Sequence, residues 1–166
     1  MITVKLDWAE RLMAIVVGGE RTIQDEAMHL KGAHGVDETC PECDLTGAIG
    51  EIALAKHFGV FWSGTVGQLN LPDVGDVQVR ATTNANGNLF IAKAVKPNGK
   101  PGDNPNHRFY FAVVRRAGYV DLHGWILGRE AQVPEFWKDP SDPSCRPRLR
   151  SPSYVVPRGR LHDMSE

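Results

Sequence analysis

One stretch of this sequence combines residue types that could bind a cation and a phosphate. LPDVGDVQVRATT (71–83) contains Asp73, and Gln78 and Arg80 follow at alternate positions of an expected strand. Carboxylate and amide oxygens are ligands that Mg²⁺ and Mn²⁺ accept. Arginine stays protonated in proteins, so Arg80 can stabilise phosphate charge but cannot act as a base. Asp76 is an alternative carboxylate, on the same face as Gln78.

A further oxygen donor is expected on the helix that precedes this stretch. Glu51 lies in TGAIGEIALAKHFG (46–59), and none of its neighbours at helical spacing is a charge partner. Glu51 is therefore either a solvent-exposed glutamate beside a narrow apolar face or a carboxylate that points inward at a cation.

The dipeptide Asn86-Gly87 lies between two apolar-rich runs and predicts a two-residue β-hairpin. Counting back from that turn places Arg80 opposite Lys93, on the same face as Gln78. The opposite face carries Val77, Val79 and other apolar residues, and is the expected core face. The alternative is an edge ribbon whose polar side only faces water.

Together these residues resemble the PD-(D/E)xK nuclease superfamily, which includes restriction endonucleases, mismatch-repair nicking enzymes and Holliday-junction resolvases. The resemblance is carried by a helix glutamate after a Gly-Glu step and by LPDVGDVQVRATT, which is similar to the tight Asp-x-x-Gly-x-(D/E)-x-K-T hairpins of the restriction and mismatch-repair branch. RFYFAVVRRAGYVDLHGWILGREA (108–131) resembles the strand–turn–strand with Gly-Trp-Ile of phage and restriction-type members. The whole chain also resembles small phage proteins, although the motifs cover only residues 46–131.

The resemblance implies an Mg²⁺- or Mn²⁺-dependent DNA endonuclease, located in the cytoplasm of the host cell if phage-encoded. It assigns Glu51 as the helix acid, Asp73 as the metal-bridging aspartate and Gln78 as the second metal ligand. Arg80 stands where the family has lysine, and Lys93 could replace that lysine. Gln78 lacks the family's charge. The alternative is therefore an inactive nuclease-fold protein that binds DNA or a host protein.

Four further residues have types that zinc accepts, namely His29, His34, Cys40 and Cys43. A Cys-x2-Cys pair with two histidines could form a structural zinc site, but a single pair at this spacing is a weak signal. Free thiols in a polar loop are the preferred interpretation. The odd number of cysteines argues against a disulfide framework.

Charge is distributed unevenly, although the net charge is only −1. Residues 1–60 carry ten acidic and five basic residues, whereas residues 107–166 carry seven acidic and ten basic residues. A basic end suggests a polyanionic partner such as DNA, and the alternative is a solvated tail. The arginines expected to contact phosphates are Arg115, Arg116, Arg146, Arg148, Arg150, Arg158 and Arg160.

The elements that must position these residues predict a single α+β domain. A helix with a capping box at Asp7 and Glu10 should end at Gly18-Gly19, and a second helix should cover 22–30. The helix over 46–59 follows, with Thr46 as N-cap and Gly59 as its stop. Strands are expected over 60–67, in the hairpin, over 108–116 and over 119–128.

The fold class expected is α+β, with a restriction-endonuclease-like core and a mostly antiparallel mixed sheet flanked by helices. The domain divides into N-terminal helices with a Cys-containing loop (1–45), a nuclease-like core (46–131) and a Pro- and Arg-rich C-terminal segment (132–166). No run is long and apolar enough to span a bilayer, so no membrane partner is expected.

Overall fold

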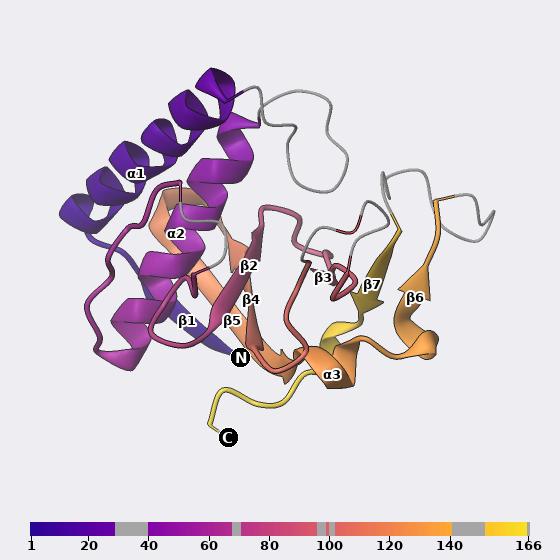
Figure 1. Cartoon of the computed structure of the whole chain (residues 1–166). Coiled ribbons are helices and arrows are strands. Elements are labelled where there is room, and N and C mark those ends of the chain that lie inside the picture. Colours follow the sequence, from indigo (N-terminus) through magenta and orange to yellow (C-terminus); the bar gives the residue numbers. More distant parts are fainter. Residues whose placement is uncertain (29–39, 68–70, 96–98, 100–101, 141–151, 166) are drawn as a thin grey trace.

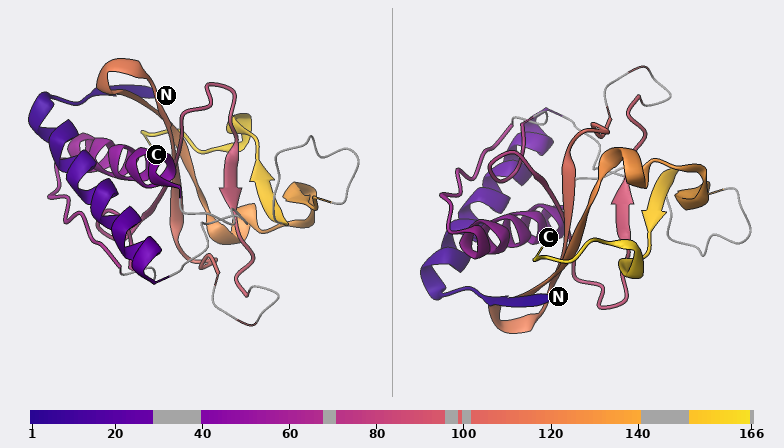
Figure 2. Two further views of the ribbon diagram at one scale, coloured as in Figure 1. Left: turned by 90° about the horizontal axis from the view of Figure 1, so that it is seen from above. Right: turned by 90° about the horizontal axis from the view of Figure 1, so that it is seen from below.

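The structure is a computed structural model that describes residues 1–28, 40–67, 71–95, 99, 102–140 and 152–165. It is an α+β fold of three layers: a helical layer, a four-stranded mixed sheet and a smaller three-stranded sheet (Figures 1 and 2). The predicted α+β class with a mixed sheet is confirmed. Helix α2 lies on one face of the larger sheet and carries α1 on its outer side, and the smaller sheet lies against the other face.

The larger sheet has the strand order β1–β5–β4–β2. Its members are β1 (Ile2–Lys5), β5 (Tyr119–Leu127), β4 (Arg108–Val114) and β2 (Gln78–Thr82). The central pair β4–β5 is antiparallel, as is β1–β5, whereas β2 runs parallel to β4. β2 is therefore an edge strand, with one side of its backbone directed away from the sheet.

The smaller sheet has the order β3–β7–β6 and is antiparallel. Its strands are β3 (Leu89–Ile91), β7 (Ser153–Val156) and β6 (Trp137–Lys138). The short helices are η2 (Arg116–Gly118), which joins β4 to β5, and α3 (Gly128–Ala131), η3 (Pro134–Phe136) and η4 (Arg158–Arg160), which follow β5 in the chain. A second apolar cluster lies between the sheets and includes Leu89, Phe109, Phe111 and Val156.

Helix α1 (Trp8–Ala27) begins as predicted, because Asp7 and Glu10 form a complete capping box. The predicted end at Gly18-Gly19 is wrong, and so is a separate helix starting at 22, because α1 continues to Ala27. A Cβ on Gly18 would lie 2.8 Å from the Cα of Leu45. Gly18 is therefore a contact point where α1 approaches α2 closely, and not a helix stop.

Helix α2 (Pro41–Phe58) begins five residues before the predicted N-cap Thr46. Its N-cap is Cys40, and Pro41 occupies the first helical position, where its missing N–H has no cost. The predicted end is confirmed, because Gly59 adopts φ 65° and its N–H bonds to Ala55 and Lys56 carbonyls.

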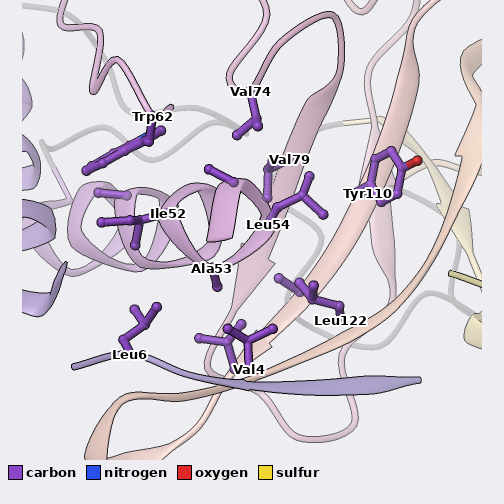
Figure 3. Packing of buried hydrophobic residues seen from close by; sticks show 14 of the residues in the cluster. Val4, Leu6, Ile52, Ala53, Leu54, Trp62, Val74, Val79, Tyr110 and Leu122 are labelled. Carbon is purple, nitrogen blue, oxygen red and sulfur yellow. The ribbon is translucent and has the colours of Figure 1, made fainter. Parts of the chain in front are cut away.

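Helix α2 contributes most of the helical side of the core (Figure 3). Ala48, Ile52, Ala53, Leu54 and Ala55 are all buried and pack against the sheet and the flanking segments. A Cβ on Gly50 would lie 2.7 Å from the Cβ of Ala81, so the helix crosses close over β2. This close crossing places Glu51, the next residue, beside the edge strand.

The predicted hairpin is absent, although Asn84–Gly87 does form a turn with the Gly87 N–H bonded to the Asn84 carbonyl at 2.9 Å. β2 pairs with β4, and β3 pairs with β7 in the other sheet. Arg80 is consequently registered with Phe111, not with Lys93. The predicted strand over 60–67 is also wrong, since no strand is assigned there.

In the parts of the chain that the structure covers, no helix is long and apolar enough to cross a membrane. The N-terminal amine lies 3.7 Å from the Asp163 carboxylate, so the two ends of the described chain are close together.

Candidate functional site

Glu51 is 5% exposed and is paired with the guanidinium of Arg21. Arg21 Nη1 donates to Glu51 Oε1 at 2.7 Å, and Nη2 donates to Oε2 at 2.8 Å. The indole Nε1 of Trp62 donates to Oε2 at 3.1 Å. The solvent-exposed alternative for Glu51 is therefore wrong, and the cation that its carboxylate meets is Arg21.

Arg21 also ties α1 to the loop after α2, because its Nε and Nη2 donate to the Thr65 carbonyl at 3.1 and 2.9 Å. Burial by itself would lower the pKa of Arg21, but the hydrogen bonds and charge of Glu51, with smaller effects from Asp73 and Asp44, raise it above its ordinary value. Arg21 is thus a permanent cation that compensates the buried acid.

Asp73 lies in the segment that leads into β2 and caps the free edge of that strand. Its Oδ2 accepts from the Val79 N–H at 2.7 Å, and its own N–H donates to the Val77 carbonyl at 3.0 Å. The side chain is 22% exposed. Burial first, and then the negative charge of Glu51, raise the pKa of Asp73 from 3.8 to about 6. The two carboxylates are therefore electrostatically coupled.

Gln78 and Arg80 lie on the face of β2 opposite Val79, and that face points toward the smaller sheet. Arg80 Nη2 donates to Asp103 Oδ1 at 2.7 Å, and Nη1 lies 3.9 Å from Asp73 Oδ2. Gln78 Nε2 donates to the Leu71 carbonyl at 3.1 Å, and its Oε1 is 3.5 Å from Arg80 Nη1. The Gln78 amide is thus turned toward the loop and toward Arg80.

Asp103 anchors this side of the site and was not predicted. Its Oδ2 accepts from the Ala92 N–H at 2.7 Å, while Gln132 Nε2 donates to the Ala92 and Asp103 carbonyls at 3.0 and 2.8 Å. Asp103 therefore holds Arg80 against the segment that follows β3.

Lys93 is not paired opposite Arg80 in a hairpin, which corrects the prediction from the hairpin register. Its Nζ is 4.2 Å from the centroid of the Trp137 ring, at the smaller sheet. Asp76 is exposed and makes no hydrogen bond or ion pair with another described residue. Of the five predicted catalytic residues, Asp73 and Gln78 lie within 3.9 Å of Arg80, Glu51 acts on Asp73 through its charge, and Lys93 contacts Trp137.

The gathered groups form two charge clusters joined at the edge of β2. Arg21 and Glu51 lie on the helical side, Arg80 and Asp103 lie on the other side, and Asp73 lies between them. An anion could bind at the arginines if it displaced their carboxylate partners. A cation could bind at the coupled carboxylates if it displaced their arginine partners.

The predicted zinc residues are not assembled into a site. Cys40 and Cys43 form a disulfide, so the preference for free thiols is wrong, and a thiolate zinc site would first require reduction. His29 and His34 lie outside the described residues. Where the structure describes the chain, it contains no group of three or more His, Cys, Asp or Glu side chains placed to hold a metal ion.

Three of the predicted phosphate-binding arginines make contacts within the described chain. Arg158 donates to the Gly87 and Ala85 carbonyls at 2.8 and 2.6 Å, and Arg160 lies 3.2 Å from Glu135. Arg115 pairs with Asp121 at 2.7 Å, whereas Arg116 is exposed. Arg146, Arg148 and Arg150 lie outside the described residues.

Sequence reasoning missed Arg21, Asp103 and the hydrogen bond from Trp62 to Glu51, because each contact lies beyond helical spacing. Arg21 and Glu51 are 30 residues apart, and Arg80 and Asp103 are 23 apart. The one available signal was Glu51 itself, which lacks a partner at helical spacing. Comparisons with family models, with curated proteins and with solved structures returned no match to this chain.

Proposed function

We propose that this chain is a divalent-cation-dependent phosphodiesterase acting on DNA, with Asp73 as its principal cation ligand. The observation that carries the proposal is the position of the mostly buried Asp73 carboxylate, 3.9 Å from the Arg80 guanidinium, where burial and the charge of Glu51 raise its pKa to about 6. Carboxyl groups perturbed in this way by burial and a specific neighbouring charge concentrate at functional sites. A divalent cation beside Asp73 would offset the repulsion between the two carboxylates.

The donor set agrees in kind with Mg²⁺ or Mn²⁺. These hard cations commonly take one or two carboxylates and complete their shell with water and substrate phosphate. Asp73 Oδ2 accepts from Val79, while Oδ1 makes no hydrogen bond to another described residue. Both oxygens of Glu51 are engaged by Arg21, so Glu51 would act mainly through its charge. Asp76 is the alternative ligand.

A bound cation would polarise a phosphate and lower the pKa of a water ligand. Arg80 would then stabilise the charge of the phosphate, exchanging its bond to Asp103 for one to the substrate. Arg80 cannot remove a proton, and the Lys93 ammonium lies over the Trp137 ring in this arrangement. Arg21 would hold the Glu51 carboxylate in its orientation.

Two measurements test this proposal. Titration of the protein with MnCl₂ or MgCl₂ by calorimetry should show binding that Asp73→Asn abolishes and that Asp163→Asn, at an exposed site, preserves. Incubation with single-stranded, duplex and branched DNA and Mn²⁺ should give cleavage with the same dependence on Asp73. If Asp76→Asn, and not Asp73→Asn, abolished metal binding and cleavage, the cation ligand would be Asp76. Absence of both metal binding and cleavage would contradict the proposal.

A second candidate is a protein of similar architecture that binds DNA or a host protein without cutting. The observation that favours it is the complete engagement of Glu51 by Arg21 and Trp62. Here Arg21 would take the place of the metal cation permanently. DNA affinity that falls steeply with salt and is unchanged by EDTA would support this candidate.

A further inference from the structure

Helix α1 exposes an apolar stripe on its outer face. Five large apolar residues at helical spacing are half or more exposed: Trp8 71%, Leu12 50%, Ile15 54%, Val16 63% and Ile23 60%. The buried residues of the same helix, Ala14, Gly18 and Thr22, lie on the face toward α2. The larger residues therefore point away from the core, the reverse of an ordinary amphipathic surface helix.

The stripe is continuous along the helix and lies at the outer surface of the molecule. In the views from above and below, α1 is the outermost element of the helical layer (Figure 2). Residues 8, 12, 15, 16, 19 and 23 follow one face, and the stripe is about 22 Å long at 1.5 Å per residue. Gly19 lies within it, and a Cβ there would meet no atom within 4 Å. Contiguous apolar surface of this kind marks interaction sites.

We propose that this stripe, Trp8 to Ile23, is the interface for a second copy of the chain, with the two α1 helices antiparallel across a two-fold axis. The midpoint of the stripe falls between Ile15 and Val16, so the axis pairs Ile15 of one copy with Val16 of the other. The same axis places Trp8 opposite Ile23. Leu12 faces Gly19, where the missing side chain leaves room for it.

A two-fold interface must be self-complementary, and the stripe meets that requirement in shape. Its large residues are opposed either by a residue of similar size or, in the case of Leu12, by glycine. Glycine on a helix face also lets two backbones approach more closely. An unrelated partner would not require this symmetry about the midpoint of the helix.

Charge complementarity supports the antiparallel direction. Basic residues lie around the N-terminal end of α1: Lys5 ends β1 just before the helix, and Arg11 is in its first turns. A Cβ on Gly118 would lie 2.7 Å from Arg11 Cδ, so η2, which contains Arg116, is close to this end. Glu10 there is neutralised by Lys56 at 2.7 Å, and Asp7 caps the helix. The C-terminal end is acidic, with Glu20, Asp25 and Glu26, while Arg21 is paired with Glu51. Antiparallel packing brings each acidic end to the basic end of the other copy.

Sedimentation velocity of the full chain over a dilution series tests the proposal. The wild type should be dimeric at about 100 µM, where even a micromolar Kd gives mostly dimer. Leu12→Glu and Val16→Glu should raise the Kd about 100-fold or more, because each places two carboxylates in an apolar interface. Val95→Glu is the matched control, since Val95 is 63% exposed like Val16. Circular dichroism checks that each variant is folded.

Two further sets of substitutions test whether the dimer forms through this antiparallel contact of α1 helices and not through another surface. Gly19→Leu has open space in a single copy but meets Leu12 of the second copy, so it should weaken the dimer without unfolding the chain. Glu20→Lys with Glu26→Lys should raise the Kd about tenfold, and adding Lys5→Glu with Arg11→Glu should restore it. A wild type that is monomeric at all concentrations, or a dimer unchanged by the α1 substitutions, would overturn the proposal. A monomeric wild type would mean that the stripe binds a different protein or a membrane surface.

Discussion

Arg21 and Glu51 join the two helices through two parallel hydrogen bonds of 2.7 and 2.8 Å, with side chains 19% and 6% exposed. Planar guanidinium and carboxylate groups match in this geometry, so the pair specifies one relative position of α1 and α2. Trp62 and the Thr65 carbonyl complete the hydrogen bonding, which is what a buried charge requires.

Removing only the arginine should be strongly destabilising. Arg21→Met leaves the Glu51 carboxylate buried beside Asp73 without its cation, and we expect the free energy of unfolding to fall by about 3 kcal/mol. Urea unfolding followed by circular dichroism measures the change. Arg21→Met with Glu51→Met should recover much of the loss. Arg129→Met, at an exposed position of α3, is the control, and an equal loss there would contradict the assignment.

Asp73 should make stability depend on pH. Its pKa is about 6 in the folded chain, against 3.8 for an unperturbed aspartic acid, so between these values the folded state binds a proton that the unfolded state does not. Stability contributed by this group is therefore lost as the pH rises from 4 to 6. We expect Asp73→Asn to raise the free energy of unfolding at pH 8 by on the order of 2 kcal/mol, and far less at pH 4.

Urea unfolding at pH 4, 6 and 8 checks this expectation for Asp73. Asp76→Asn, in the same loop but exposed, should leave the pH profile unchanged. In the wild type, Mg²⁺ or Mn²⁺ should increase stability more at pH 8 than at pH 4, because a cation competes with the proton for the same carboxylate. An Asp73→Asn variant with the wild-type pH profile would show that the Asp73 pKa is not raised.

The two adjacent glycines of α1 should respond oppositely to alanine. At Gly18 a Cβ would meet the Leu45 backbone at 2.8 Å, so Gly18→Ala should separate the helices and cost about 2 kcal/mol. At Gly19 the space is open, so Gly19→Ala should stabilise the helix by up to about 1 kcal/mol. Thermal unfolding of dilute protein measures both. Equal effects at both positions would contradict the observed helix packing.

Alanine variants of Arg158 and Arg116 should distinguish an arginine that stabilises the fold from one that is free to bind a ligand. Arg158→Ala removes two hydrogen bonds to the Ala85–Gly87 turn and should lower the free energy of unfolding by about 1–2 kcal/mol. Arg116 is exposed, so Arg116→Ala should leave stability within about 0.5 kcal/mol of the wild type. If this surface contacts DNA, Arg116→Ala should also reduce the slope of affinity against salt. If Arg116→Ala lowered the free energy of unfolding more than Arg158→Ala, the structural role assigned to Arg158 would be wrong.

Local sequence determined the features that depend on neighbouring residues. The capping box at Asp7 and Glu10, the stop at Gly59 and the strand that became β4 all follow from short patterns, because caps, turns and apolar runs act within a few residues. The α+β class followed from the order of these elements. Asp73 and the polar face of Gln78 and Arg80 were likewise visible in the alternation of one strand.

Tertiary structure decided which elements meet. The Asn86-Gly87 turn predicted a hairpin between the strands on either side of it. Instead β2 pairs with β4, β3 pairs with β7, and the apolar residues Leu89 and Ile91 of β3 are buried between the sheets. The register that paired Lys93 with Arg80 therefore does not exist. Gly18 looked like a helix stop and is instead a contact point between helices.

The same division holds for the charged residues. Glu51 was identifiable from sequence as an acid without a local partner, but its cation comes from a helix 30 residues earlier. Likewise, Trp8, Leu12, Ile15 and Val16 recur at helical spacing in the sequence, while their exposure is decided by α2, which packs against the smaller-residue face of α1. A sequence shows which residues need a partner. Packing over long separations decides which partner each one receives.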